Sequence, residues 1–231
     1  MLLDALLGEF SWSMIIGSIL ASLMLIFLVS PLHELSHAGV ALALGDKTPK
    51  WQGRITLNPM AHIDWIGSLM IILFGFGWAK PVQVNMRNFK YPKLGMAITA
   101  LAGPFSNFLV AFIAAIFFAP VAEWCMPAFS SYVGSNSYML EEIVWYLYTT
   151  FILLNIYIGL FNLIPIPPLD GSRILSAVLP NKYYFQLMQY ERYSFILFVI
   201  VFFVLDVGDY LAVMANNIVD IFFDLSIIIF A

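Results

Sequence analysis

The stretch Trp12–His37, WSMIIGSILASLMLIFLVSPLHELSH, joins a long apolar run to a group of ionisable residues. Its first part, Trp12–Ser30, carries no charge and is close to the ~20 apolar residues that cross a bilayer core. Its second part, His33–His37, places two histidines and a glutamate just after that run. Ionisable side chains in such a position are costly and usually functional. The stretch therefore predicts a membrane-spanning helix with a polar site at one end.

The composition of the whole chain also indicates a membrane protein. Of its 231 residues, 62% are hydrophobic and 10% are charged, whereas soluble domains have roughly 45–50% and 25%. So few charges cannot cover the surface of a soluble protein of this size. The net charge is −4 without a basic cluster, so nucleic acid is not an expected partner. A single cysteine, Cys125, excludes an internal disulfide.

The apolar runs predict an all-α polytopic membrane protein with about five spanning helices. The runs are Trp12–Ser30, Leu94–Ala119, Tyr138–Ile164, Phe185–Leu205 and a weaker fifth, Tyr210–Phe230, which polar residues interrupt. The run Ile66–Phe76 is only about half a membrane long, so we predict a re-entrant or shallow segment there. Between Pro49 and Asn58, the β-branched and aromatic residues of Lys50–Leu57 predict a short strand or hairpin arm.

The chain shows no internal repeat and no long polar linker. We therefore predict one membrane-embedded domain over residues 1–231, with its core at about 12–180 and accessory helices at about 185–231. Lysine and arginine predict the orientation, because they concentrate in cytoplasmic loops. Seven of the ten lie from Lys47 to Lys93, the other three follow the third full span, and the loop Pro120–Ser137 has none. This asymmetry places the N-terminus outside and the 45–93 segment in the cytoplasm.

The pentapeptide His33-Glu-Leu-Ser-His37 has the spacing of a metal site on a helix. Positions i and i+4 share one face, so both imidazoles can bind one metal ion. Glu34 lies beside them, where it can take a proton from a metal-bound water. The alternative is a chance pattern whose histidines are satisfied by hydrogen bonds. Among chains with so few histidines and glutamates, however, only about one in a thousand should contain this pentapeptide by chance.

A catalytic zinc site usually has three protein ligands, so a third one is needed. The residues leave two candidates, which are His62 and an acid on the same side of the membrane. Asp170 follows the stretch Asn162–Leu169, whose three prolines prevent a regular helix. Irregular backbone at membrane depth is tolerated where it is buried or lines a cavity. A metal ligand explains Asp170 better than the alternative, an aspartate in an ordinary turn.

Four stretches together resemble the site-2 proteases, a family of intramembrane zinc metalloproteases, in their compact prokaryotic form without PDZ or CBS domains. The stretches occur in the family's order and cover about Ser30–Pro180. They are His33–His37, Leu57–Asp64 (LNPMAHID), Gly77–Asn85 (GWAKPVQVN) with Ala102–Asn107 (AGPFSN), and Asn162–Gly171 (NLIPIPPLDG). The first and the last are the specific ones, since a zincin pentapeptide is rarely paired with a proline-rich turn in a membrane.

The resemblance implies that His33, His37 and Asp170 bind one Zn²⁺ per chain and that Glu34 is the general base that activates a zinc-bound water. It implies that Asn107 supports the active site by holding the substrate carbonyl or the oxyanion. Alternatively, the Asn107 amide bonds to helix backbone. His62 is then expected to order the cytoplasmic segment without touching the metal.

The implied activity is hydrolysis of peptide bonds in or near the transmembrane segments of single-span membrane proteins, often after a first cut by another protease. Such an enzyme would lie in a prokaryotic inner membrane, with its active site near the cytoplasmic face. A strand at Lys50–Leu57 would hold the unwound substrate by strand addition. Two alternatives remain: a zinc transporter or sensor, which has no use for Glu34, and an inactive relative that acts as a scaffold.

Overall fold

The computed structural model describes residues 12–74, 77–130, 139–180, 183 and 206–230, and every regular element in these ranges is a helix. Four of the described helical stretches are long and apolar enough to cross a membrane. They are Ile15–Ala43, Pro92–Ile116, Met139–Asn162 and Val207–Phe230. The prediction of an all-helical polytopic protein is confirmed to this extent, and the expected span Phe185–Leu205 lies outside the described residues.

The first long helix consists of three continuous parts: α2 (Trp12–Met24), the π-helix η1 (Leu25–Val29) and α3 (Ser30–Ala43). Pro31 lies in the first turn of α3. A proline inside a helix removes one hydrogen-bond donor and crowds the carbonyl of the preceding turn, and a wider π turn relieves this crowding. The helix therefore continues past the apolar run, and the pentapeptide lies on two of its later turns.

The two halves of this helix have different neighbours. Most contacts of α2 are with α8 (Met139–Asn162), whereas α3 packs against α6 (Pro92–Ile116). Gly17 of α2 allows the close approach to α8, because a Cβ there would lie 2.8 Å from the Tyr146 Cβ. The change of partner occurs across η1.

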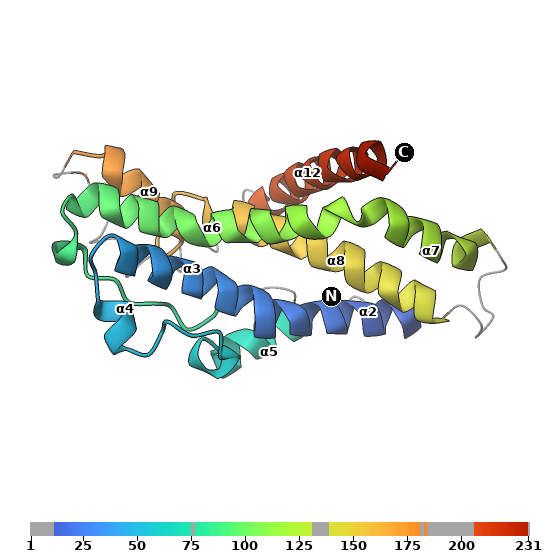
Figure 1. Cartoon of the computed structure of the whole chain (residues 1–231), viewed down its shortest axis with the longest axis horizontal. Coiled ribbons are helices and arrows are strands. Elements are labelled where there is room, and N and C mark those ends of the chain that lie inside the picture. Colours follow the sequence, from blue (N-terminus) through green and yellow to red (C-terminus); the bar gives the residue numbers. More distant parts are fainter. Residues whose placement is uncertain (1–11, 75–76, 131–138, 181–182, 184–205, 231) are drawn as a thin grey trace.

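Helix α6 lies at the centre of the molecule and contacts α3, α8, α9 (Asp170–Val178) and α12 (Val207–Phe230) (Figure 1). Its small residues Ala111 and Ala115 pack against Ile152 and Ile156 of α8 in a buried cluster. After α6 the chain continues into α7 (Phe118–Ser130), which lies at the opposite end of the long axis from α9 (Figure 1).

The predicted strand at Lys50–Leu57 is wrong. The chain instead forms a single helical turn, α4 (Thr48–Trp51), followed by irregular backbone. The Asp46 Oδ1 accepts hydrogen bonds from the Thr48 backbone N at 3.0 Å and the Thr48 Oγ1 at 2.6 Å, and Pro49 occupies the first turn. These are the features that start a helix, and Gly53, with φ of 68°, ends it. These local contacts outweigh the β-branched composition here.

Two short 3-10 turns, η2 (Pro59–Ala61) and η3 (Met86–Asn88), flank the helix α5 (Trp65–Phe74). The ten residues of α5 make a helix of about 15 Å, which is half of a bilayer core. Residues 77–85 are irregular and are called the 77–85 segment below. A Cβ on Gly67 of α5 would lie within 3.0 Å of the Trp78 backbone, so the segment starts in close contact with α5. Membrane re-entry at Ile66–Phe76 stays a prediction.

Candidate metal centre

His33 and His37 are buried on the same face of α3, and their Nε2 atoms lie 3.1 Å apart. The His37 Nδ1 donates to the backbone carbonyl of Thr99 at 2.7 Å. The His33 Nδ1 donates to the Asn107 Oδ1 at 3.3 Å. Both acceptors belong to α6, so α6 fixes the two rings. When Nδ1 carries the proton of a neutral imidazole, Nε2 keeps its lone pair and can bind a metal ion.

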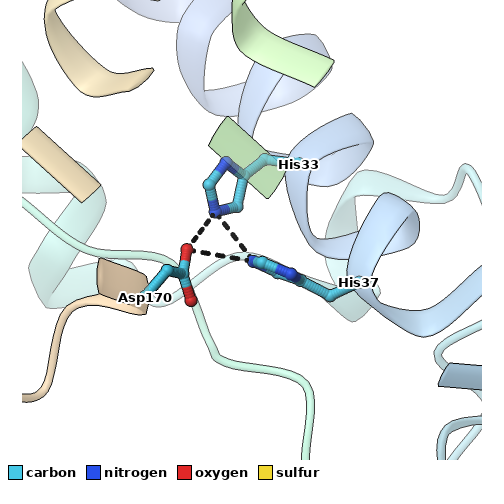
Figure 2. A group of neighbouring side chains, drawn as sticks. All are labelled: His33, His37 and Asp170. Atoms are coloured by element: carbon cyan, nitrogen blue, oxygen red, sulfur yellow. Dashed lines mark hydrogen bonds and ion pairs between the residues drawn. The ribbon is translucent and has the colours of Figure 1, made fainter. Parts of the chain in front are cut away.

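Asp170 completes the cluster from α9, where it is the first residue (Figure 2). Its Oδ2 lies 3.3 Å from the His33 Nε2 and 3.2 Å from the His37 Nε2. The turn that delivers it is tight, because a Cβ on Gly171 would lie within 3.0 Å of the Leu163 and Ile164 carbonyl oxygens. Asp170 thus provides the polar side chain, and Gly171, which has no Cβ, lets the backbone of the turn pack closely beside it.

The three atoms that converge suit a cation. Two imidazole lone pairs and one carboxylate oxygen are all electron donors, so their convergence is unfavourable without a proton or a metal ion between them. Their separations, 3.1, 3.2 and 3.3 Å, are close to the spacing of about 3.3 Å between tetrahedral ligands at zinc bond lengths. Among the described residues, His33, His37 and Asp170 form a group of candidate ligands whose atoms all lie within 4.8 Å of one another.

Helix α6 closes one side of this group at Gly103. A Cβ at this position would lie less than 3.0 Å from the Nε2 atoms of both His33 and His37. Any side chain here would push into the place where the two candidate ligands meet, so glycine is required for the close approach of α6.

Glu34 is buried beside the candidate ligands, on the same helix as the two histidines. Its Oε2 accepts a hydrogen bond from the backbone N of Val82 at 2.8 Å. Val82 belongs to the 77–85 segment and is itself buried. The carboxylate is thus oriented by a backbone donor that lies far away in the sequence, and Glu34 is not one of the three converging groups.

The 77–85 segment is fastened at further points. The backbone N of Lys80 donates to the His62 carbonyl at 2.8 Å. The backbone N of Asn85 donates to the Asp46 Oδ2 at 2.7 Å, and the Asn88 Nδ2 donates to the Asp46 Oδ1 at 2.7 Å. Asp46 is fully buried. Burial alone would raise the pKa of this carboxyl, but hydrogen bonds from Thr48, Asn88 and Asn85 outweigh it and hold the pKa below its usual value.

His62 lies apart from the candidate ligands. Its ring is fully buried, and its Nε2 donates to the Thr56 carbonyl at 3.0 Å. It therefore joins two parts of the loop between α4 and α5, and the group of three that the structure brings together does not include it.

The Asn107 Oδ1 accepts a hydrogen bond from the His33 Nδ1, and its buried Nδ2 has no hydrogen-bond partner in the described part of the chain. The contact with His33 was not among the expectations from the sequence, and a role of Asn107 toward the substrate stays a prediction. Sequence reasoning also missed the Val82 amide and Asp46. A backbone donor leaves no signature in the side-chain sequence, whereas Asp46 had one, since an aspartate before Thr48-Pro49 is a helix-start pattern.

Comparisons with known proteins add an independent line of information. The profile of peptidase family M50 matches residues 20–205. Over 194 residues, which are 84% of each chain, the sequence is 40% identical to a Bacillus subtilis (strain 168) protein named "Putative zinc metalloprotease YwhC". Over 159 residues it is 34% identical to "Zinc metalloprotease MJ0392" of Methanocaldococcus jannaschii, which covers 69% of this chain and 34% of that protein. No solved structure was found to match.

Proposed function

The chain belongs to peptidase family M50 and is a zinc metalloprotease, and we propose that it cuts peptide bonds in or near the transmembrane segments of other membrane proteins. The observation that carries this proposal is the convergence of two imidazole nitrogens and one carboxylate oxygen, buried among membrane-length helices next to Glu34. A protease site for soluble substrates could lie in a water-filled surface cleft and would not need to be built from helices of this length.

We propose that His33, His37 and Asp170 hold one zinc ion per chain. Zinc, when bound, supplies the positive charge that makes water acidic enough to lose a proton near neutral pH. The Nδ1 contacts with Thr99 and Asn107 support this assignment, because they orient both rings and leave the Nε2 lone pairs facing Asp170.

We assign Glu34 as the general base. The carboxylate takes the proton of the attacking water and then gives it to the leaving amine. The Val82 N–H fixes one of its oxygens, which reduces the rotamer freedom of the base before substrate binds. Asn107 is the proposed donor to the substrate carbonyl, because a buried amide N–H without a partner is unfavourable until something accepts its hydrogen bond.

The 77–85 segment is the proposed binding site of the unwound substrate. A transmembrane helix hides its peptide bonds in its own hydrogen bonds, so it must unwind before attack. This segment is irregular and touches the base at Val82, while its neighbours Pro81 and Gln83 are exposed. We therefore propose this segment, instead of Lys50–Leu57, as the part of the chain that holds the substrate, because the structure has no strand at Lys50–Leu57.

The remaining parts of the proposal follow from charge and family. The substrates are single-span membrane proteins first cut by another protease, and residues 1–231 act as one catalytic domain. The basic residues between Lys47 and Lys93 support a site near the cytoplasmic face of a prokaryotic inner membrane. The elements α4, α9 and the start of α6 all lie at one end of the molecule, which agrees with this orientation (Figure 1).

A cleavage assay with co-expressed single-span proteins tests the proposal. Glu34→Gln keeps the shape of the side chain and removes the base, so cleavage should fall about 1,000-fold while bound zinc stays at one ion per chain. Glu123→Gln, on the exposed face of α7, is the matched control and should cleave like the wild type. Wild-type cleavage by Glu34→Gln, or loss of its zinc, would refute the assigned role.

A further inference from the structure

We propose that Asp46 is a positioning residue for the catalytic base: its carboxylate fastens the 77–85 segment so that the Val82 N–H stays on Glu34. This inference rests on the proposed function only in treating Glu34 as the base. Asp46 lies outside the group of candidate zinc ligands, after the end of α3.

The Asp46 carboxylate makes two kinds of contact. Its local contacts, to the Thr48 backbone N and Oγ1, start α4. Its distant contacts, to the Asn85 backbone N and the Asn88 Nδ2, hold the end of the 77–85 segment and the turn η3. Starting α4 requires only the first kind. A fully buried carboxylate that also binds Asn85 and Asn88 therefore has a second task.

The distant contacts fix the segment relative to the base. Asp46 is tied to α3, because its backbone N donates to the Ala41 carbonyl at 2.9 Å. Glu34 lies on the same helix. The segment is therefore attached to α3 twice, at Val82 through Glu34 and at Asn85 through Asp46. The attachment of Asn85 to Asp46 therefore fixes the position from which the Val82 N–H reaches Glu34.

Without Asp46, the remaining fastenings are weaker for this purpose. The Lys80 N binds the His62 carbonyl and the Lys80 carbonyl accepts from the Arg54 Nη1 at 3.4 Å, and both partners belong to the loop between α4 and α5. Trp78 contacts Gly67 of α5. The contact between the Gln52 Nε2 and the Gln83 Oε1 is exposed, so water competes with it. None of these contacts ties the segment to the helix that carries the base.

The central test compares Asp46→Ala with Thr48→Val in the full-length enzyme. Asp46→Ala should lower kcat about 10- to 100-fold on a cleaved single-span substrate, because small misplacement of a catalytic group has effects of this size. Zinc content should not change. Thr48→Val removes the Thr48 Oγ1 contacts to Asp46 and, at 3.5 Å, to Asn88, and it keeps both distant contacts of Asp46, so its kcat should stay within about twofold of wild type. Wild-type kcat in folded Asp46→Ala would overturn the inference.

A double variant separates positioning from general damage. Val82→Pro removes the N–H that binds Glu34. If Asp46 acts through this donor, Asp46→Ala combined with Val82→Pro should lose no more kcat than Val82→Pro alone. Losses that multiply would show that Asp46 acts elsewhere, which overturns the inference. If Asp46→Ala does not fold, Asn88→Ala replaces it in the same cycle, since it keeps the Asp46 carboxylate and removes only the Asn88 Nδ2 contacts to Asp46 and Thr48.

Hydrogen exchange keeps this inference distinct from the proposed function. Asp46→Ala should speed amide exchange across residues 79–86 and leave α6 unchanged, whereas Thr48→Val should not. If the wild type cleaves no substrate but exchange responds in this way, the protease proposal fails and the fastening stands. If the wild type cleaves and Asp46→Ala matches it in both exchange and kcat, only the inference about Asp46 fails.

Discussion

The two halves of the first helix differ in what they bury. Before the π-helix η1, α2 presents Ser13, Gly17 and Ala21 to α8 and packs by close contact of small residues. After η1, α3 buries two histidines and a glutamate, and other segments bind each of them: α6 and α9 the histidines, the 77–85 segment the glutamate. One continuous helix thus serves first as a packing surface and then as a scaffold for chemistry.

This difference shows how a membrane protein can keep stability and reactivity apart. In α2 the contact at Gly17 depends on shape, since a Cβ there would lie 2.8 Å from the Tyr146 Cβ, and the Ser13 hydroxyl donates to Glu142 of α8. In α3 the buried polar groups are favourable only if partners from other segments are in place. Changes to the buried polar groups of the second half should therefore impair zinc binding or activity, whereas changes in the first half should reduce stability alone.

The largest effect is expected from the third candidate ligand. Asp170→Ala should lower bound zinc to well below one ion per chain and abolish cleavage, because two histidines alone hold zinc weakly. His62→Ala should keep its zinc, since His62 binds the Thr56 carbonyl instead. Metal analysis of both purified variants measures this. The reverse result would make the site one of three histidines.

A smaller but still large effect is expected at Gly103. Gly103→Ala brings a methyl group against both Nε2 atoms, so zinc affinity should fall and kcat/KM should drop about 100-fold. The matched control is Gly39→Ala on α3, where a Cβ would meet nothing within 4 Å. Equal zinc affinity in the two variants would contradict the tight contact of α6 with the histidines.

Gly17→Ala tests the first half of the helix. The added Cβ would lie 2.8 Å from the Tyr146 Cβ, and overpacking of this kind destabilises by about 1–3 kcal/mol. Thermal unfolding in detergent should show the loss, with zinc content and kcat of the folded enzyme unchanged. A loss of zinc in this variant would mean that the two halves are coupled across η1.

The smallest effect concerns pH and Asp46. Because the folded pKa of Asp46 lies below its unfolded value of about 3.9, this carboxylate contributes stability above that value. The contribution is lost as the pH falls through the folded pKa. Asp46→Asn should therefore be less stable than wild type near neutral pH, and the difference in unfolding temperature should shrink as the medium becomes strongly acidic. A constant difference would contradict the assigned pKa shift.

The sequence predicted the elements whose signals are local. The span lengths follow from apolar runs, and the juxtaposition of His33 with His37 follows from helix periodicity. Asp170 could be singled out because the prolines before it prevent a helix, and the structure brings it to the histidines. Zinc binding by these residues stays a prediction.

The features that sequence reasoning missed depend on contacts between distant segments. The π-helix η1 results from Pro31 together with the change of packing partner from α8 to α6, and the periodicity of apolar residues in the sequence does not indicate it. The strand expected at Lys50–Leu57 did not form because Pro49 and the hydrogen bonds from Thr48 to Asp46 favour a helical turn there. The Val82 amide contributes through its backbone, which is the same for nearly every amino acid, so only the fold can show its role.

The contact at Gly103 also bears on how the enzyme could be inhibited. With the α6 backbone against both histidines at Gly103, a small chelating drug would have no room on that side of an ion held by the candidate ligands. Glu34 and the 77–85 segment, which is the proposed binding site of the unwound substrate, lie next to the same group of candidate ligands. A compound that joins a metal-binding group to an extended, peptide-like arm would use both features at once, whereas a simple chelator would gain nothing from the second and would have poor selectivity among zinc enzymes.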